Sequence, residues 1–160
     1  MQNSPIPAII VLIFLLAGCH SEDHATERHA EVAEIGKHVM PFDLERSTHV
    51  FEKAENGGLQ QVFSDDGDVE QIGFIREHLS MQAGKFSDGD FHDPAMIHGH
   101  DMPGLHDLAM RATELSITYS EIENGGQIIY SAADTTLVGA IHDWFDAQVS
   151  DHGSHAQAHR

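Results

Sequence analysis

Two stretches of the chain share one pattern of hydrophobic and polar positions. Each begins with a run in which apolar and polar residues alternate, continues through the string Glu-Asn-Gly-Gly, and ends in a second apolar run. The first stretch is residues 48–68 and the second is residues 116–134. A period of two is typical of half-buried β-strands, and Asn-Gly between such runs favours a tight turn in which glycine supplies a positive φ. The pattern therefore predicts two β-hairpins, centred on Asn56-Gly57-Gly58 and Asn124-Gly125-Gly126.

An amphipathic segment follows each predicted hairpin. Apolar residues in 69–82 and in 135–148 recur at helical spacing, and the two segments align without a gap. Asp68 and Asp134 precede these segments and are favourable N-cap residues, because a carboxylate can accept hydrogen bonds from the first free backbone amides. We therefore expect a ββα unit that the chain makes twice.

The duplication predicts the α+β class. Two ββα units can form a four-stranded antiparallel sheet with both helices on one face, so that the units share a core that neither could bury alone. Strand alternation places His49 and Phe51 on one face, matching Ile117 and Tyr119 in the second unit. We expect that face to be the core face. His49 is then a polar residue where the second unit has isoleucine.

The rest of the chain divides by composition. Residues 20–40 are polar and charged, and the C-terminal residues are polar and rich in histidine. We expect a signal peptide (1–18), a polar tether with a helical stretch near 30–39 (19–43), the duplicated domain (44–152) and a loose tail (153–160). Within the domain we expect repeat one (48–82), a linker that ends in a short helix over 105–112 (83–114) and repeat two (115–149).

The N-terminal apolar run indicates the localisation of the protein in the cell. It spans 11 residues, from Ala8 to Gly18, and stops at Cys19, the only cysteine of the chain. A membrane-spanning helix needs roughly 20 residues, so the run fits a cleaved signal better. Leu16-Ala17-Gly18-Cys19 resembles the lipobox of bacterial lipoproteins, which implies a diacylglycerol on the Cys19 sulfur. We expect a lipid-anchored envelope protein that faces the periplasm, and an ordinary N-terminal anchor helix is the alternative. One feature departs from the lipoprotein pattern, because residues 1–7 carry no Lys or Arg.

Charge and missing motifs exclude several classes of function. The chain has 8 basic and 26 acidic residues, for a formal net charge of −18. Nucleic-acid binding needs basic groups that neutralise phosphate, so it is excluded. The chain has no G-x-S-x-G, P-loop or H-E-x-x-H motif. We expect a protein that is not an enzyme, that reaches the membrane through the lipid on Cys19, and that has a protein partner or forms a homodimer through the open sheet face.

Histidine is the residue type that suggests chemistry, because neutral imidazole is the commonest metal ligand. The chain has 14 histidines. The linker places His98, His100 and Met102 close together, and imidazole with a thioether suits copper, whereas imidazole with carboxylate suits zinc. A solvated polar loop, with Met102 at the edge of the core, is the alternative interpretation of this segment.

Further candidate ligands lie outside the linker. His142 shares a helix face with Asp146, which could orient its ring. His152 follows at the helix end, where the helix dipole alone also favours a histidine. Convergence of His49, His98 and His142 would make a copper or zinc site. The expected ligands are His49, His98, His100, Met102, His142 and His152.

Three functions are compatible with these residues. The first is transition-metal binding for sequestration, delivery or resistance. The second is a non-catalytic interaction or structural role, in which the histidines only cover the surface. The third is an enzyme that uses the loop around His98 for acid–base chemistry. Loading the apo protein with copper, zinc or nickel would separate the first two.

Residues 40–155 resemble a family of small bacterial proteins that are often labelled aspartate carbamoyltransferase. The shared strings are MPFD (40–43), THVF (48–51), IREHL (75–79), GDF-x-DPA-x-IHG (89–99), MPGL (102–105), IH-x-WFDAQ (141–148) and DHGSH (151–155). That activity requires a basic phosphate site and two α/β domains. The chain has 8 basic residues, is too short for two such domains, and lacks an S-T-R-T phosphate loop. The resemblance therefore implies no carbamoyltransferase activity.

Overall fold

The protein has an α+β fold in a computed structural model, which describes residues 20–159 and only the backbone of residues 20–23. Within that range the longer elements are α1 (His20–Val39), β1 (Ser47–Ala54), β2 (Gly57–Ser64), α2 (Val69–Ser87), α3 (His92–His98), α4 (Leu105–Met110), β3 (Leu115–Ile122), β4 (Gly125–Ala132), α5 (Thr135–His152) and β5 (Ala156–Gln157). No helix within this range is long and apolar enough to cross a membrane.

The two predicted ββα units are confirmed. β1 pairs with β2 and β3 pairs with β4, both antiparallel, and a helix follows each hairpin. Asp68 caps α2 by accepting a hydrogen bond from the Gln71 amide. Asp134 caps α5 in the same way. Local sequence patterns were sufficient here because each hairpin and each cap involves residues close together in the chain.

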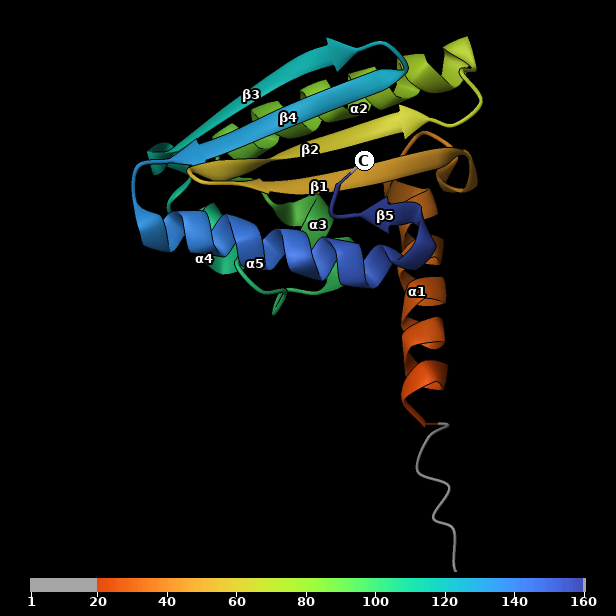
Figure 1. Cartoon of the computed structure of the whole chain (residues 1–160), viewed down its shortest axis with the longest axis horizontal. Coiled ribbons are helices and arrows are strands. Elements are labelled where there is room, and N and C mark those ends of the chain that lie inside the picture. Colours follow the sequence, from red (N-terminus) through yellow and green to blue (C-terminus); the bar gives the residue numbers. More distant parts are fainter. Residues whose placement is uncertain (1–19, 160) are drawn as a thin grey trace, which may run out of the picture.

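The predicted four-stranded antiparallel sheet is wrong in its number of strands and in its uniform direction. The sheet has five strands in the order β3-β4-β2-β1-β5 and is mixed (Figure 1). β5 pairs in parallel with β1, with Ala156 opposite His49. The tail over 153–160, expected to be loose, thus contributes a strand. Its two residues pair through backbone groups, which carry no hydrophobic pattern for sequence analysis to detect.

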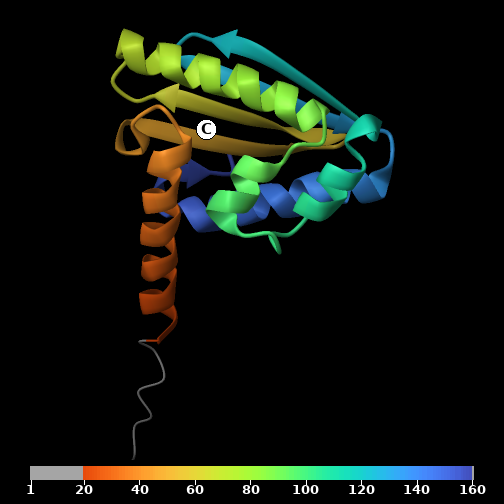
Figure 2. The same ribbon diagram turned by 180° about the vertical axis from the view of Figure 1, so that it is seen from behind.

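Both long repeat helices cover one face of the sheet, as predicted. Phe145 of α5 approaches Gly58, and Leu79 of α2 approaches Gly126. These glycines belong to one face. Gly58 lies opposite Tyr130, and Gly126 lies four residues before Tyr130 on β4, so all three point to the same side of the sheet. Figure 2 shows α2, α3 and α4 in front of this face. On the opposite face, Gln61 donates to Gln127, and Gln127 donates to Ser120.

Part of the segment expected to be a tether is a helix packed on the domain. Val32 is 1% exposed, and α1 contacts both α3 and α5. Val32, Ile35 and Val39 lie three and four residues apart, so they form an apolar stripe on α1. The expected helical stretch near 30–39 was too short, since α1 begins at His20. Its N-terminal end extends beyond the sheet (Figures 1 and 2).

The linker between the repeats is more ordered than its Gly-rich and Pro-rich composition suggests. α2 continues to Ser87, five residues past the expected end of repeat one, and α3 forms within the linker. The predicted short helix is confirmed as α4. Met102 and Leu105 are buried in the core, which agrees with the structural alternative for Met102.

The Gly-Gly pairs act in packing more than in the turns. The two-residue turns are Glu55–Asn56 and Glu123–Asn124, and no non-glycine residue in 20–159 has a positive φ. A Cβ on Gly125 would instead lie 1.9 Å from the Val62 carbonyl oxygen of β2. Gly125 therefore permits the close pairing of β2 with β4 that joins the two repeats.

Substitution of Gly125 by alanine should lower the free energy of unfolding by about 2–4 kcal/mol, because the added methyl group collides with backbone. Gly139, inside α5, is the matched control, since a Cβ there meets nothing within 4 Å. Gly139→Ala should stabilise the protein by about 0.5–1 kcal/mol through helix propensity. Urea unfolding of both variants would measure these effects, and equal changes would contradict the packing role of Gly125.

Candidate functional site

Three of the predicted metal-binding residues lie together in the structure. His49 comes from β1, His98 from the end of α3, and His152 from the end of α5. The ring centroids of His49 and His152 are 5.1 Å apart, and those of His98 and His152 are 4.9 Å apart. We call His49, His98 and His152 the histidine cluster. His152 thus bridges the other two rings.

His49 is a core residue, as strand alternation predicted. It is 4% exposed, and its Nε2 is buried with no hydrogen-bond partner among the described residues. Burial lowers the pKa of His49 to about 3, and repulsion from His78, His155 and His98 adds to this effect. His49 is therefore neutral at pH 7 and keeps one ring nitrogen unsatisfied.

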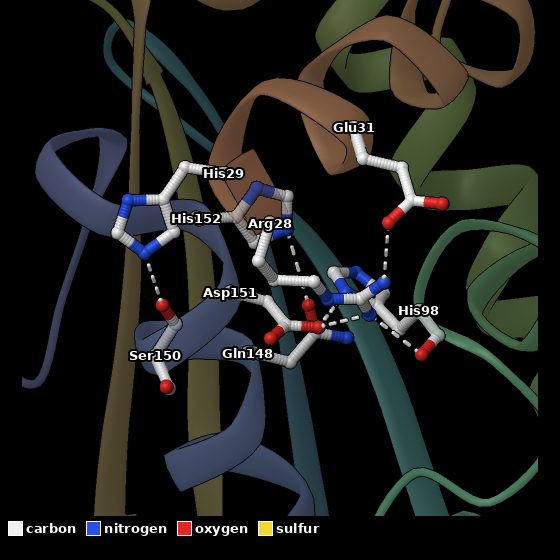
Figure 3. A network of polar contacts seen from close by, with 8 residues as sticks. All are labelled: Arg28, His29, Glu31, His98, Gln148, Ser150, Asp151 and His152. Carbon is white, nitrogen blue, oxygen red and sulfur yellow. Dashed lines mark hydrogen bonds and ion pairs between the residues drawn. The ribbon is translucent and has the colours of Figure 1, made fainter. Parts of the chain in front are cut away.

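An ion-pair network holds His98 against α1 and α5. His98 Nδ1 donates to Asp151 Oδ2 over 2.9 Å, and Arg28 Nη2 donates to the same oxygen over 2.7 Å (Figure 3). Arg28 Nη2 also donates to the His98 carbonyl oxygen. Burial lowers the pKa of His98, although the hydrogen bond to Asp151 opposes that shift. This network fixes the His98 ring and attaches α1 to the domain.

Asp151 remains ionised although it is partly buried. Burial alone would raise the pKa of Asp151, but the hydrogen bonds from Arg28 and His98 outweigh it and lower the pKa. The next residue of α1 adds a second contact, because His29 Nε2 donates to the Ser150 carbonyl oxygen over 2.8 Å (Figure 3). The C-terminal end of α5 is therefore held to α1 at two points.

A cavity of about 210 Å³ borders the cluster, between α1, β1 and the C-terminal segment. His49 and His152 line it together with His29, His155 and Glu45. His152 Nε2 donates to Gln148 Oε1 over 3.2 Å, and burial lowers the pKa of His152 well below its ordinary value. The cavity therefore has a wall of imidazoles, two of which are held neutral.

Sequence reasoning missed several residues of this site. His78 is 7% exposed, its Nδ1 is buried without a partner among the described residues, and burial lowers its pKa to about 4. When the two repeats are aligned, His78 occupies the same position as Trp144, which is a core residue. This match could have identified His78 as buried. Arg28 and His29 were missed because their segment was interpreted as a tether. The only signal for a docked helix was the apolar spacing of Val32, Ile35 and Val39, later in the same segment.

The other predicted ligands do not join the cluster. His142 Nε2 donates to the carbonyl oxygens of Ala54 and Gly57, and so holds the first hairpin. It lies ten residues before His152 on α5, which is about 15 Å of helix rise. The expected convergence of His49, His98 and His142 is therefore wrong, because His142 does not join the other two histidines. Asp146 does not orient His142 but pairs with Lys53 over 2.6 Å.

His100 and Met102, the remaining predicted ligands in the described residues, also lie outside the histidine cluster. His100 is exposed and lines a second cavity, whereas Met102 is buried among apolar side chains. Cys19, the expected lipidation site, lies outside the described residues. Among the side chains of residues 24–159, no three His, Cys, Asp or Glu groups are arranged to hold one metal ion.

Comparisons with protein-family models, with curated proteins and with solved structures found no match to this chain. The resemblance noted from the sequence strings therefore stays a prediction.

Proposed function

We propose that this protein binds a transition-metal ion, copper or zinc, through the histidine cluster, for sequestration or delivery without catalysis. The observation that carries the proposal is the buried Nε2 of His49, which has no partner among the described residues and lies beside His152. A buried polar atom without a partner costs about 1–3 kcal/mol. A metal ion offsets this cost, because it binds the unused lone pair of a neutral imidazole.

The protonation state, spacing and surroundings of the cluster support metal binding. Burial keeps His49 and His152 neutral, and only neutral imidazole coordinates a metal. Two imidazoles on one zinc ion have ring centroids about 5 Å apart, since each nitrogen lies roughly 2.0–2.1 Å from the ion. The observed separations are 5.1 and 4.9 Å. His98 is held by Asp151, so the rings of His49 and His152 must turn to face one ion, and both line the adjoining cavity, which gives them room.

An interaction or structural lipoprotein without metal is the second candidate. It is favoured by one observation, namely that no three potential ligands in residues 24–159 already surround a common point. In that case the cluster would serve packing, and Arg28, Asp151 and His98 would fix α1 on the domain. The two candidates differ in whether added metal changes stability.

Zinc, or copper(I) under anaerobic reducing conditions, should raise the thermal unfolding midpoint. Metal that binds the native state alone at 100 times its dissociation constant stabilises by about 2.7 kcal/mol. For a domain of this size we expect a shift of about 10 °C, measured by circular dichroism at pH 7.5.

A pair of variants tests whether the cluster is responsible for that shift. His152→Gln removes the central ring of the cluster and should abolish the metal-dependent shift. His38→Gln is the matched control, because His38 is exposed on α1 and lies outside the cavity lining. An unchanged midpoint with each metal, or an equal shift in the two variants, would leave the interaction module as the better proposal.

We also propose that Cys19 carries the lipid that anchors the protein in the bacterial envelope. Cys19→Ala should leave the precursor uncleaved at this site and unlipidated, because the thiol is the only acceptor in the chain. Detergent-phase partitioning and intact mass spectrometry of membrane fractions would measure the loss. Cys19→Ala protein with a diacylglycerol mass, or with normal detergent partitioning, would contradict the proposal.

A further inference from the structure

A second cavity, of about 300 Å³, lies between α3 and α4 and is separate from the histidine cluster. Three exposed histidines line it: His92, His100 and His106. His92 begins α3, His106 is the second residue of α4, and His100 lies in the loop between these helices. α3 therefore carries a histidine of this cavity at its first residue and a histidine of the buried cluster at its last.

The backbone that presents these rings is firmly held. Gly104 has a φ of +76°, and a Cβ at this position would lie 2.0 Å from the Ala140 carbonyl oxygen of α5. Met102 and Leu105, on either side of Gly104, are buried. The loop is thus anchored to the core just after His100. The spacing of the three histidines is consequently set by the fold.

The rings themselves are not held. Within residues 24–159, no hydrogen bond or ion pair to the ring of His92, His100 or His106 is present, and the three rings do not face one point as they stand. An exposed ring can turn between staggered conformers at small cost. Asp90 also borders the cavity, and the chain carries a net charge of −18. That field favours a cation over an anion.

We propose that His92, His100 and His106 form a second, surface-exposed site for a divalent transition-metal cation. Zinc and copper(II) fit, because imidazole nitrogen is a suitable ligand for both ions. The site does not depend on the histidine cluster, whose ligands come from β1, α5 and the other end of α3. It also gives the histidine-rich linker a role that the buried cluster does not explain.

The test is calorimetric titration of the full mature domain with Zn²⁺ and with Cu²⁺ at pH 7.5. The variant H92Q/H100Q/H106Q should lose one binding equivalent, or bind it at least tenfold more weakly. The matched control H24Q/H38Q/H159Q replaces three exposed histidines that do not line this cavity, and it should keep that equivalent. Unchanged melting of both variants without metal would verify that they fold.

Nuclear magnetic resonance locates the ion independently. With His152→Gln added to both triple variants, one equivalent of Cu²⁺ should broaden amide signals from residues 92–106 in the control variant and not in H92Q/H100Q/H106Q. Identical isotherms for the two triple variants, or broadening elsewhere, would overturn this inference. His152→Gln separates it from the buried site, because that variant should lose the thermal shift and keep the surface equivalent.

Discussion

Lowering the pH from 7.5 to 5 should remove about 4 kcal/mol of stability through His49 and His78 alone. Burial lowers the pKa of His49 to about 3 and that of His78 to about 4, whereas an unfolded histidine titrates near 6.5. Below pH 6.5 the unfolded chain therefore binds more protons than the folded chain. Stability is present above the unfolded pKa and falls by about 1.4 kcal/mol per pH unit for each such histidine.

The other charged groups around the cluster modify this slope without reversing it. His98 and His152 also have lowered pKa values, so they add to the loss in acid. Asp151 opposes the shift of His98, and Asp93 opposes that of His78. Because a small domain has a total stability of about 5–15 kcal/mol, this loss is a large fraction of what holds the fold together in acid.

Urea unfolding at half-unit steps of pH would measure the slope. The variant His78→Leu should reduce the slope by about 1.4 kcal/mol per pH unit, because one of the strongly shifted histidines is then absent. A free energy of unfolding that stays constant between pH 7.5 and 5 would show that these imidazoles are not held neutral by burial.

Replacing His49 by leucine should stabilise the metal-free protein by about 1–3 kcal/mol at pH 7.5. The substitution removes a buried nitrogen that has no partner among the described residues and puts an apolar side chain between Phe42 and Phe51. The second repeat already has Ile117 at this position, so the sheet accepts an aliphatic residue there. The same variant should lose the metal-dependent shift, since it lacks one ligand of the cluster.

His142→Leu is the matched control for this substitution. His142 Nε2 donates to the carbonyl oxygens of Ala54 and Gly57, so its loss should destabilise the protein by about 1 kcal/mol. The metal-dependent shift should persist in that variant. Destabilisation by His49→Leu, or a retained metal shift, would contradict the role given to His49. Gain of stability with loss of binding is the pattern expected of a residue kept for function.

The sequence by itself determined the elements that depend on neighbouring residues. Alternation defined both hairpins, helical spacing defined α2 and α5, and Asp68 and Asp134 were identified as caps. Alternation also placed His49 on the core face. These predictions succeeded because periodicity and capping act over a few residues, where sequence distance and spatial distance are the same.

Only the tertiary structure decided which distant segments meet. β5 joins β1 through backbone hydrogen bonds that any two residues could form, so no side-chain pattern marks it. His98 and Asp151 are 53 positions apart, and Arg28 and Asp151 are 123 positions apart. The candidate site depends on these contacts, and α1 and the C-terminal segment form one wall of it. Polar composition in both segments predicted solvation, whereas a few buried residues such as Val32 were enough to dock α1 and enclose the cavity.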